Sequence, residues 1–181
     1  MRKFFVLLLA MMLIMTGFTA CGSDSEGESG GNAAGGVEGT PAEIIEKIYG
    51  EFPVTDLPLG TIEIDLTDAD AVKMFTGLDS ADKIDAAAAS ESMMGAQAYS
   101  LVVVKVKDAA DAETVAKEMM NGIDQRKWIC VEADDLRVAA AGDTAVLMMV
   151  SSEHADVVTA ADITDAFGAV AGGLALNEAK Q

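Results

Sequence analysis

The segment from Ala98 to Lys107 carries a β-branched run, and near its centre apolar side chains stand at both odd and even positions. Successive side chains of a strand point to opposite faces of a sheet. This run therefore predicts a strand with apolar side chains on both faces, which is typical of a central strand, and β-branched residues favour strands in general. The fold of this chain must be built around a sheet.

Helical patterns surround this strand. Thr40-Pro41-Ala42-Glu43 has the form of a capping box with proline at the first helical position, and predicts the start of a helix. A short second helix is expected to begin at a cap formed by Thr67 and Asp70 and to stop at Gly77. Apolar residues at helical spacing predict further helices over residues 111–120 and from about Thr159 onward.

Short alternating or apolar runs predict strands at residues 61–66, 128–131, 136–141 and 144–151. The last three are separated by possible hairpin turns at Asp134-Asp135 and Gly142-Asp143. Residues 79–94 fit either a helix over 79–89 or an edge strand over 86–94. Together the patterns predict an α+β fold, a two-layer sandwich of a mainly antiparallel sheet of about four to five strands with helices packed on it. This single domain is expected to occupy residues 40–176, with a tail at 177–181.

The N-terminus has the order of an export signal. Arg2 and Lys3 precede an apolar run from Phe4 to Met15, which is shorter than the roughly 20 residues that a spanning helix needs. Small residues then lead into Cys21, and the segment resembles the lipobox of bacterial lipoproteins. That resemblance implies cleavage after residue 20 and a lipid on the thiol of Cys21. The alternative is an ordinary secretory signal in which Cys21 stands by chance.

Residues 21–39 are rich in glycine, serine and acidic residues, with almost no large apolar side chain, and predict a disordered tether. Removing residues 1–20 would remove two basic residues and no acid, so the net charge would change from −18 to −20. This charge argues against nucleic-acid binding. The lipid on Cys21 would then attach the domain to the extracytoplasmic face of the membrane. An envelope protein or a small ligand is a possible further partner.

The sequence contains no recognisable catalytic set, metal site or cofactor motif. His154 is the only histidine, and a solvated surface position is the favoured interpretation for it. Asp65, Asp68 and Asp70 could hold calcium, but they lack the glycine and glutamate of an EF-hand loop, so helix capping is favoured. Cys130 has no cysteine partner once Cys21 carries lipid, and we expect it to be buried.

One segment, Asp124 to Val131, differs chemically from the rest of the acidic domain. It contains Arg126 and Lys127, two of the few cations, followed by Trp128, the only tryptophan. A basic and aromatic spot of this kind is a candidate interaction site. The favoured alternative is structural, with charges at a helix end followed by a tryptophan that packs on the sheet.

At this segment the chain resembles a bacterial lipoprotein domain family known only as a domain of unknown function, the four-three-five-eight family. The resemblance is carried by Arg126 to Val131 and by shorter pieces: Gly77-Leu78, Met93-Met94, the strand from Ala98 to Asp108, and Gly142-Asp143. It spans roughly residues 42–170. It implies a lipid-anchored envelope protein and brings no activity, substrate or catalytic residue with it.

These observations lead to one hypothesis and two alternatives. The leading hypothesis is a non-enzymatic binding or protein-interaction module of the cell envelope that uses Arg126, Lys127 and Trp128. The first alternative is an envelope enzyme or enzyme inhibitor that acts through surface carboxylates. The second is a calcium-dependent module at Asp65, Asp68 and Asp70.

Overall fold

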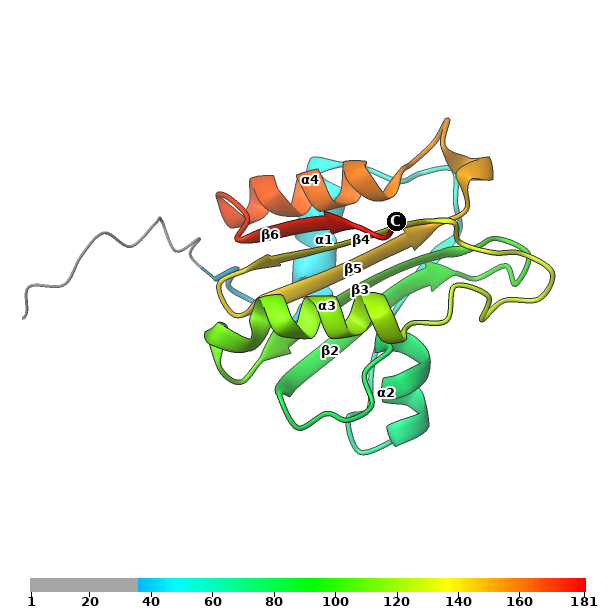
Figure 1. The fold of residues 1–181 in the computed structure, drawn as a ribbon. Helices are drawn as coiled ribbons and strands as arrows, with labels where there is room; N and C mark the ends of the chain where they lie inside the picture. Colours follow the sequence, from blue (N-terminus) through cyan, green and yellow to red (C-terminus); the bar gives the residue numbers. More distant parts are fainter. Residues whose placement is uncertain (1–35) are drawn as a thin grey trace, which may run out of the picture. The chain divides into compact units, whose positions relative to one another are not determined.

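A six-stranded sheet forms the centre of residues 36–181, the part of the chain that the computed structural model describes (Figure 1). Neighbouring strands are all antiparallel, and their order is β1-β2-β3-β5-β4-β6. The strands are β1 (Leu59–Glu63), β2 (Ile84–Ser92), β3 (Tyr99–Val106), β4 (Asp135–Ala141), β5 (Thr144–Val150) and β6 (Leu176–Ala179). The predicted α+β class and antiparallel sheet are therefore confirmed, but the sheet has six strands rather than four to five.

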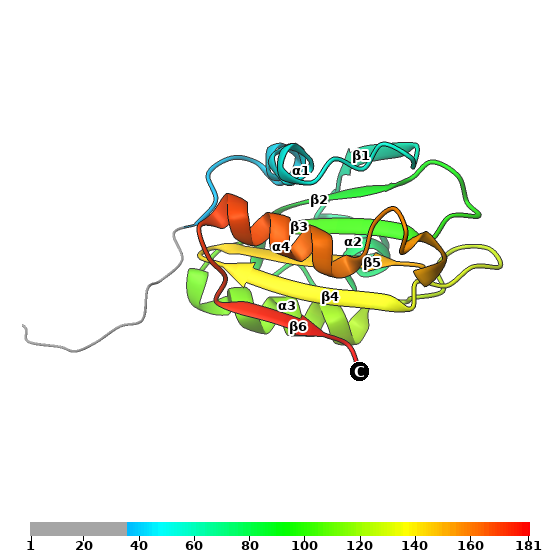
Figure 2. The same ribbon diagram turned by 90° about the horizontal axis from the view of Figure 1, so that it is seen from above.

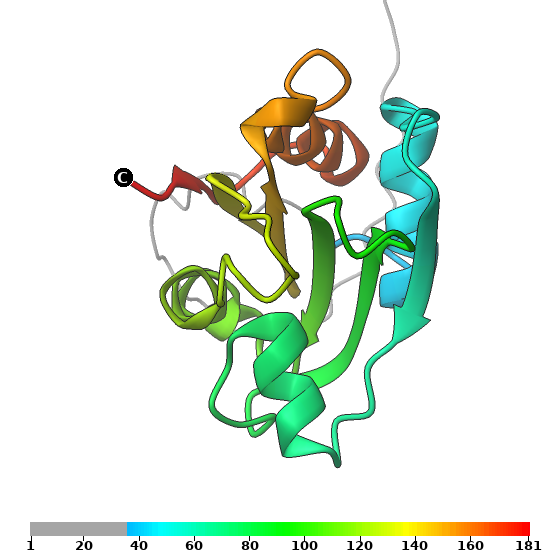
Figure 3. The same ribbon diagram turned by 90° about the vertical axis from the view of Figure 1, so that its right-hand side faces the viewer.

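Four helices pack on this sheet, two on each face. They are α1 (Pro41–Glu51), α2 (Ala69–Thr76), α3 (Ala112–Gly122) and α4 (Ala160–Ala171), with short 3-10 turns η1 (Ala109–Asp111) and η2 (Ser152–His154). Helices α1 and α4 cover one face, and α2 and α3 cover the other, as the views from above and from the end show (Figures 2 and 3). In residues 36–181 no helix is long and apolar enough to cross a membrane.

The fold has three layers, a sheet between two pairs of helices, so the predicted two-layer sandwich is wrong. In β3, Val102 and Val104 belong to the core beneath α3, whereas Leu101 and Val103 belong to the core beneath α1 and α4. Every residue of β5 is buried. A strand that is apolar on both faces requires a cover on each side, because exposed apolar area is unfavourable in water. The pattern that predicts a central strand therefore also requires helices on both faces.

Three local predictions were wrong for identifiable reasons. Residues 84–92 form a strand, β2, as one of the two alternatives expects, but β2 is internal rather than an edge strand. Its alanines project to both faces of the sheet, with Ala87 and Ala89 in the core beneath α3 and Ala88 in the core beneath α1 and α4. Residues 128–131 form no strand, so Asp134-Asp135 is not a hairpin turn. Residues 177–179, expected in a tail, continue β6, whose only buried side chain is Leu176 and which therefore gives little apolar signal.

The helix ends follow the sequence closely. The Thr40–Glu43 capping box is confirmed at the start of α1, and Thr159 caps α4 in the same way. The cap of α2 is Asp68 rather than Thr67 or Asp70. The helix ends as predicted at Gly77, which has a φ of 78°. A side chain at Gly77 would also collide with the backbone of Ile123, so this glycine allows the ends of α2 and α3 to approach closely.

The two ends of the sheet differ. At one end, which we call the Val37 end, Lys105 of β3 donates to the carbonyl of Val37 and pairs with Asp143 in the β4–β5 turn. At the opposite end, which we call the loop end, lie the β2–β3 connection (93–98), the connection from α3 to β4 (123–134) and η2. Figure 1 shows these loops at the right and the first described residues at the left. The candidate site lies at the loop end.

Candidate functional site

The connection from α3 to β4 contains a loop whose two ends are joined by hydrogen bonds. The side-chain amide of Gln125 donates to the carbonyl of Ala133 at 2.6 Å, and the N–H of Ala133 donates to the carbonyl of Gln125 at 2.9 Å. One residue further in, Nε of Arg126 donates to Oε2 of Glu132 at 2.8 Å. Loops whose ends are close together in this way are compact and are frequently functional. We call residues 125–133 the Trp loop.

Lys127 points from the Trp loop into the protein. Only 9% of its side chain is exposed, and its ammonium group contacts Oε1 of Glu91 in β2. The same group lies 3.4 Å from Oγ of Ser100 in β3 and 5.3 Å from the ring centroids of Phe75 and Trp128. Lys127 thus connects the Trp loop to two strands and to α2.

The electrostatics of this contact depend on burial. Removing the ammonium group from water lowers the pKa of Lys127, and the charge and hydrogen bond of Glu91 oppose this shift only in part. The Glu91 carboxylate also accepts a hydrogen bond of 2.7 Å from Ser100, so both charged groups have polar partners. A buried charge pair is tolerated when its remaining hydrogen-bonding positions are filled in this way.

Ser100 and Lys127 lie close together but are not arranged to act as a catalytic pair. A hydroxyl beside an amine is one arrangement that enzymes use for nucleophilic catalysis. Here the Ser100 side chain is fully buried in β3 and donates its proton to Glu91. The hydroxyl therefore cannot reach the carbonyl of an outside substrate in this conformation. The cluster fixes the Trp loop in place.

Beyond Lys127 the Trp loop turns outward. Trp128 is half-buried and packs against the core beneath α3, whereas Ile129 has 79% of its surface exposed. Cys130 is exposed and has a φ of 65°, so the expectation that it is buried was wrong. The physical reason is that Lys127 and Trp128 take the inward positions, and the chain must reverse direction after them.

Exposed apolar side chains gather at the loop end. Among residues 36–181 the large exposed apolar side chains are Ile62, Met74, Met93, Met94 and Ile129. The last three belong to the two loops at this end, and Met93 has 78% of its surface exposed. We call Met93, Met94, Trp128 and Ile129 the loop-end surface. Exposed apolar side chains on two loops at the same end of the sheet make that end a candidate contact surface.

The charges around the loop-end surface are mainly negative. Arg126 pairs with Glu132 and Lys127 with Glu91, so the two cations of this segment are neutralised by neighbours. Lys127 is buried and the exposed Arg126 is balanced by Glu132, so this segment adds no net positive charge to the surface. Asp124 and Asp134 carry exposed carboxylates directly before and after the Trp loop. Glu153 in η2 and Asp156 just after it carry two more. Asp134 accepts from the N–H and the hydroxyl of Ser152, which holds η2 at this end of the sheet.

Asp65, Asp68 and Asp70 have local structural roles or none. Asp65 accepts hydrogen bonds from the N–H and the hydroxyl of Thr67, and Asp68 caps α2 through the N–H groups of Asp70 and Ala71. In residues 36–181 no group of three or more histidine, cysteine, aspartate or glutamate side chains is arranged to hold a metal ion.

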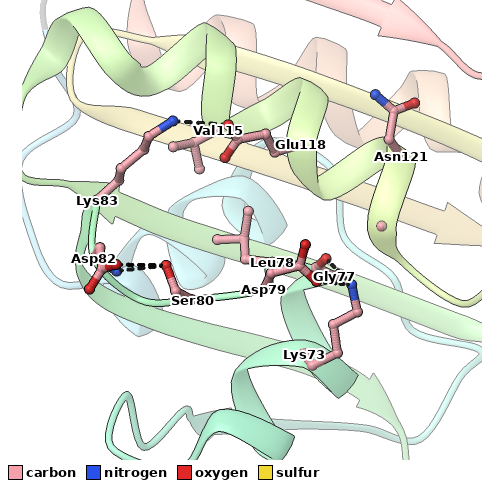
Figure 4. Close-up of a pocket in the computed structure, with 11 residues that line it drawn as sticks. Lys73, Gly77, Leu78, Asp79, Ser80, Asp82, Lys83, Val115, Glu118 and Asn121 are labelled. Atoms are coloured by element: carbon pink, nitrogen blue, oxygen red, sulfur yellow. Dashed lines mark hydrogen bonds and ion pairs between the residues drawn. The ribbon is translucent and has the colours of Figure 1, made fainter.

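A cavity of about 570 Å³ lies elsewhere, between α3 and the connection from α2 to β2 (Figure 4). Lys83 reaches Glu118 across it at 2.9 Å, and Lys73 contacts Asp79 at 2.7 Å. Lys73 also donates to the carbonyl of Gly77. Because its lysines are already paired, this cavity offers a ligand no free cation.

The structure thus separates the three predicted candidates for interaction. Lys127 is buried and acts as an anchor, Arg126 closes the base of the Trp loop, and Trp128 is half-buried at the loop-end surface. The sequence did not point to Glu91 and Ser100. They face each other across β2 and β3, and only the strand register reveals that pairing.

Comparison with known families adds one finding. Residues 62–128 match the model of a family described as Domain of unknown function (DUF4358). The resemblance noted in the sequence is confirmed, over a shorter range than residues 42–170. The match includes Glu91, Ser100 and Lys127, so the contacts that anchor the Trp loop lie within the family's range. No curated protein and no solved structure matches the chain.

The anchoring role of Lys127 predicts a large loss of stability in Lys127→Met. Glu91 would lose its charged partner while its side chain stays only 22% exposed. Breaking a buried pair costs about 3–5 kcal/mol, and we expect the lower end of this range because Glu91 retains some contact with water. Urea denaturation of the full-length protein measures this loss as a lower free energy of unfolding.

Two further variants test whether the loss of stability comes from the broken Lys127–Glu91 pair or from replacing any lysine with methionine. Adding Glu91→Gln to Lys127→Met is expected to restore at least half of the loss, because a neutral amide needs no cation and can still accept from Ser100. Lys83→Met, which breaks the exposed pair with Glu118, is expected to cost less than about 1 kcal/mol. Equal losses in Lys127→Met and Lys83→Met would contradict the anchoring role.

Proposed function

We propose that this protein is a lipoprotein anchored by Cys21 on the extracytoplasmic face of the membrane, and that its folded domain is a non-enzymatic binding module of the cell envelope. The observation that carries the binding role is the Trp loop. Its base is closed by hydrogen bonds, its anchor is buried, and its tip presents Ile129 to solvent.

The anchor is supported by the order of features in the sequence. Two cations, a short apolar run, small residues and Cys21 follow one another as in the lipobox of bacterial lipoproteins. Cys21 lies outside the described residues. The structure describes the chain from Gly36 onward, and Val37 lies at the end of the sheet opposite the Trp loop.

A binding role is supported by the way in which the loop-end surface is held. An exposed isoleucine at the tip of a floppy loop would lose conformational entropy when it binds, and that cost weakens association. The Trp loop is held at its base by Gln125, Arg126 and their partners, and behind its tip by Lys127. Such a loop meets a partner with little further ordering.

A non-enzymatic role is supported because the side chains that could take part in catalysis are buried or already paired. Ser100 and Lys127 are buried and engaged with Glu91. The carboxylates Asp79 and Glu118, which line the cavity at α3, are each paired with a lysine. Binding requires only the exposed surface, whereas catalysis would require one of these groups to be released.

The anchor predicts different outcomes for the two cysteines. Cys21→Ser is expected to abolish incorporation of labelled palmitate in the bacterial cell and to move the protein out of the membrane fraction. Cys130→Ser is the matched control, because Cys130 is exposed on the Trp loop and has no proposed lipid. Palmitate labelling that persists in Cys21→Ser would contradict the proposed anchor.

The binding role predicts a partner at the tip of the Trp loop. A photo-crosslinking amino acid placed at position 129 of the anchored protein in living cells is expected to give a discrete crosslinked product. The same amino acid at Ala110 is the control, because Ala110 is exposed in η1, which follows the end of β3 beside Lys105 and so lies at the Val37 end. Identical products at both positions, or no product at position 129, would contradict the proposed site.

A further inference from the structure

We infer that the loop-end surface binds a basic polypeptide segment that also carries apolar side chains. This inference rests on the proposed function and adds the chemistry of the partner. A basic and aromatic spot with free charges would select an acidic partner, but both cations of this segment are paired with carboxylates.

The apolar component of the partner follows from the exposed side chains. Met93, Met94 and Ile129 have 78%, 54% and 79% of their surfaces exposed. Burying such side chains against apolar groups is favourable in proportion to the area removed from water. Methionine side chains also adapt to partners of different shape because they are flexible and polarisable. A polypeptide with leucine-like side chains satisfies this surface, whereas a purely ionic ligand leaves it exposed.

The basic component follows from the charge balance at the same end. Arg126 and Lys127 are neutralised by Glu132 and Glu91. The exposed carboxylates of Asp124, Glu153 and Asp156 have no salt-bridge partner in the described part of the chain. The full chain has a net charge of −18, so the long-range field also attracts cations. Lysine and arginine side chains that flank an apolar contact would pair with these carboxylates.

The same charges disfavour two other occupants. A second copy of this acidic domain would bring carboxylates against carboxylates, and like charges across an interface oppose association. A membrane surface with anionic lipids would be repelled for the same reason.

Trp128 makes the test direct, because it is the only tryptophan of the chain and lies at the loop-end surface. The probe is a short peptide of lysines and leucines without aromatic residues, titrated into the full-length protein while Trp128 fluorescence is recorded. We expect a saturable change that weakens as salt is added. A peptide with serines in place of the leucines, and one with glutamates in place of the lysines, are expected to give no saturable change.

Matched variants locate the contact. Ile129→Ser is expected to weaken binding of the lysine–leucine peptide by about tenfold, as for a residue near the centre of an interface. Glu153→Gln combined with Asp156→Asn is expected to weaken it by about three- to fivefold, as for charges at the rim. Glu46→Gln combined with Asp165→Asn removes the same charge from the exposed surfaces of α1 and α4, and is expected to leave binding unchanged.

Several results would overturn the inference. These are an equal response to the glutamate–leucine peptide, no response to the lysine–leucine peptide, a Trp128 response to vesicles of anionic lipid instead, or a dimer in sedimentation experiments that Ile129→Ser dissociates. The crosslinking experiment separates this failure from that of the proposed function. A product specific to position 129 together with a negative peptide titration refutes only the partner's chemistry, whereas absence of that product refutes the site itself.

Discussion

The contact between the ammonium group of Lys127 and the carboxylate of Glu91 determines how the loop end is built. Both groups are largely removed from water, so neither can leave the other without a large cost in free energy. Ser100 completes the cluster, and Phe75 and Trp128 lie beside the ammonium group. Since Trp128 and Ile129 follow Lys127 directly, this single contact sets the direction in which the tip of the Trp loop points.

Much of the fold can be predicted from local sequence signals. The caps at Thr40 and Thr159 and the left-handed turn at Gly77 depend on neighbouring residues alone, and the structure has all three. The run in β3 correctly predicts a central strand. The two-layer prediction was wrong because β3 and β5 are buried on both faces and therefore need helices on each side of the sheet. The strands β2 and β6 were hard to identify, because alanine gives little strand signal and β6 buries only Leu176.

The candidate site could be predicted only in part. The clustering of Arg126, Lys127 and Trp128 draws attention to the segment that forms the Trp loop, because cations are scarce in this acidic chain. The role of each residue depends on partners that are distant in sequence. Glu91 lies 36 positions from Lys127, and the register of β2 and β3 places it opposite Ser100, where the Trp loop brings Lys127 to both. Neutralisation of the cations and exposure of Ile129 follow from those contacts, and local patterns do not encode them.

The central claim is that a buried charge pair holds a projecting loop as a contact surface. Amide hydrogen exchange of the Trp loop, compared between the wild type and Lys127→Met, tests it most directly, with the N–H of Ala133 as the reporter because it donates to the carbonyl of Gln125. The account predicts that in Lys127→Met the amides of the Trp loop exchange nearly as fast as those of an unstructured peptide, while β3 and β5 stay protected. Trp-loop amides that remain as protected as in the wild type would contradict it.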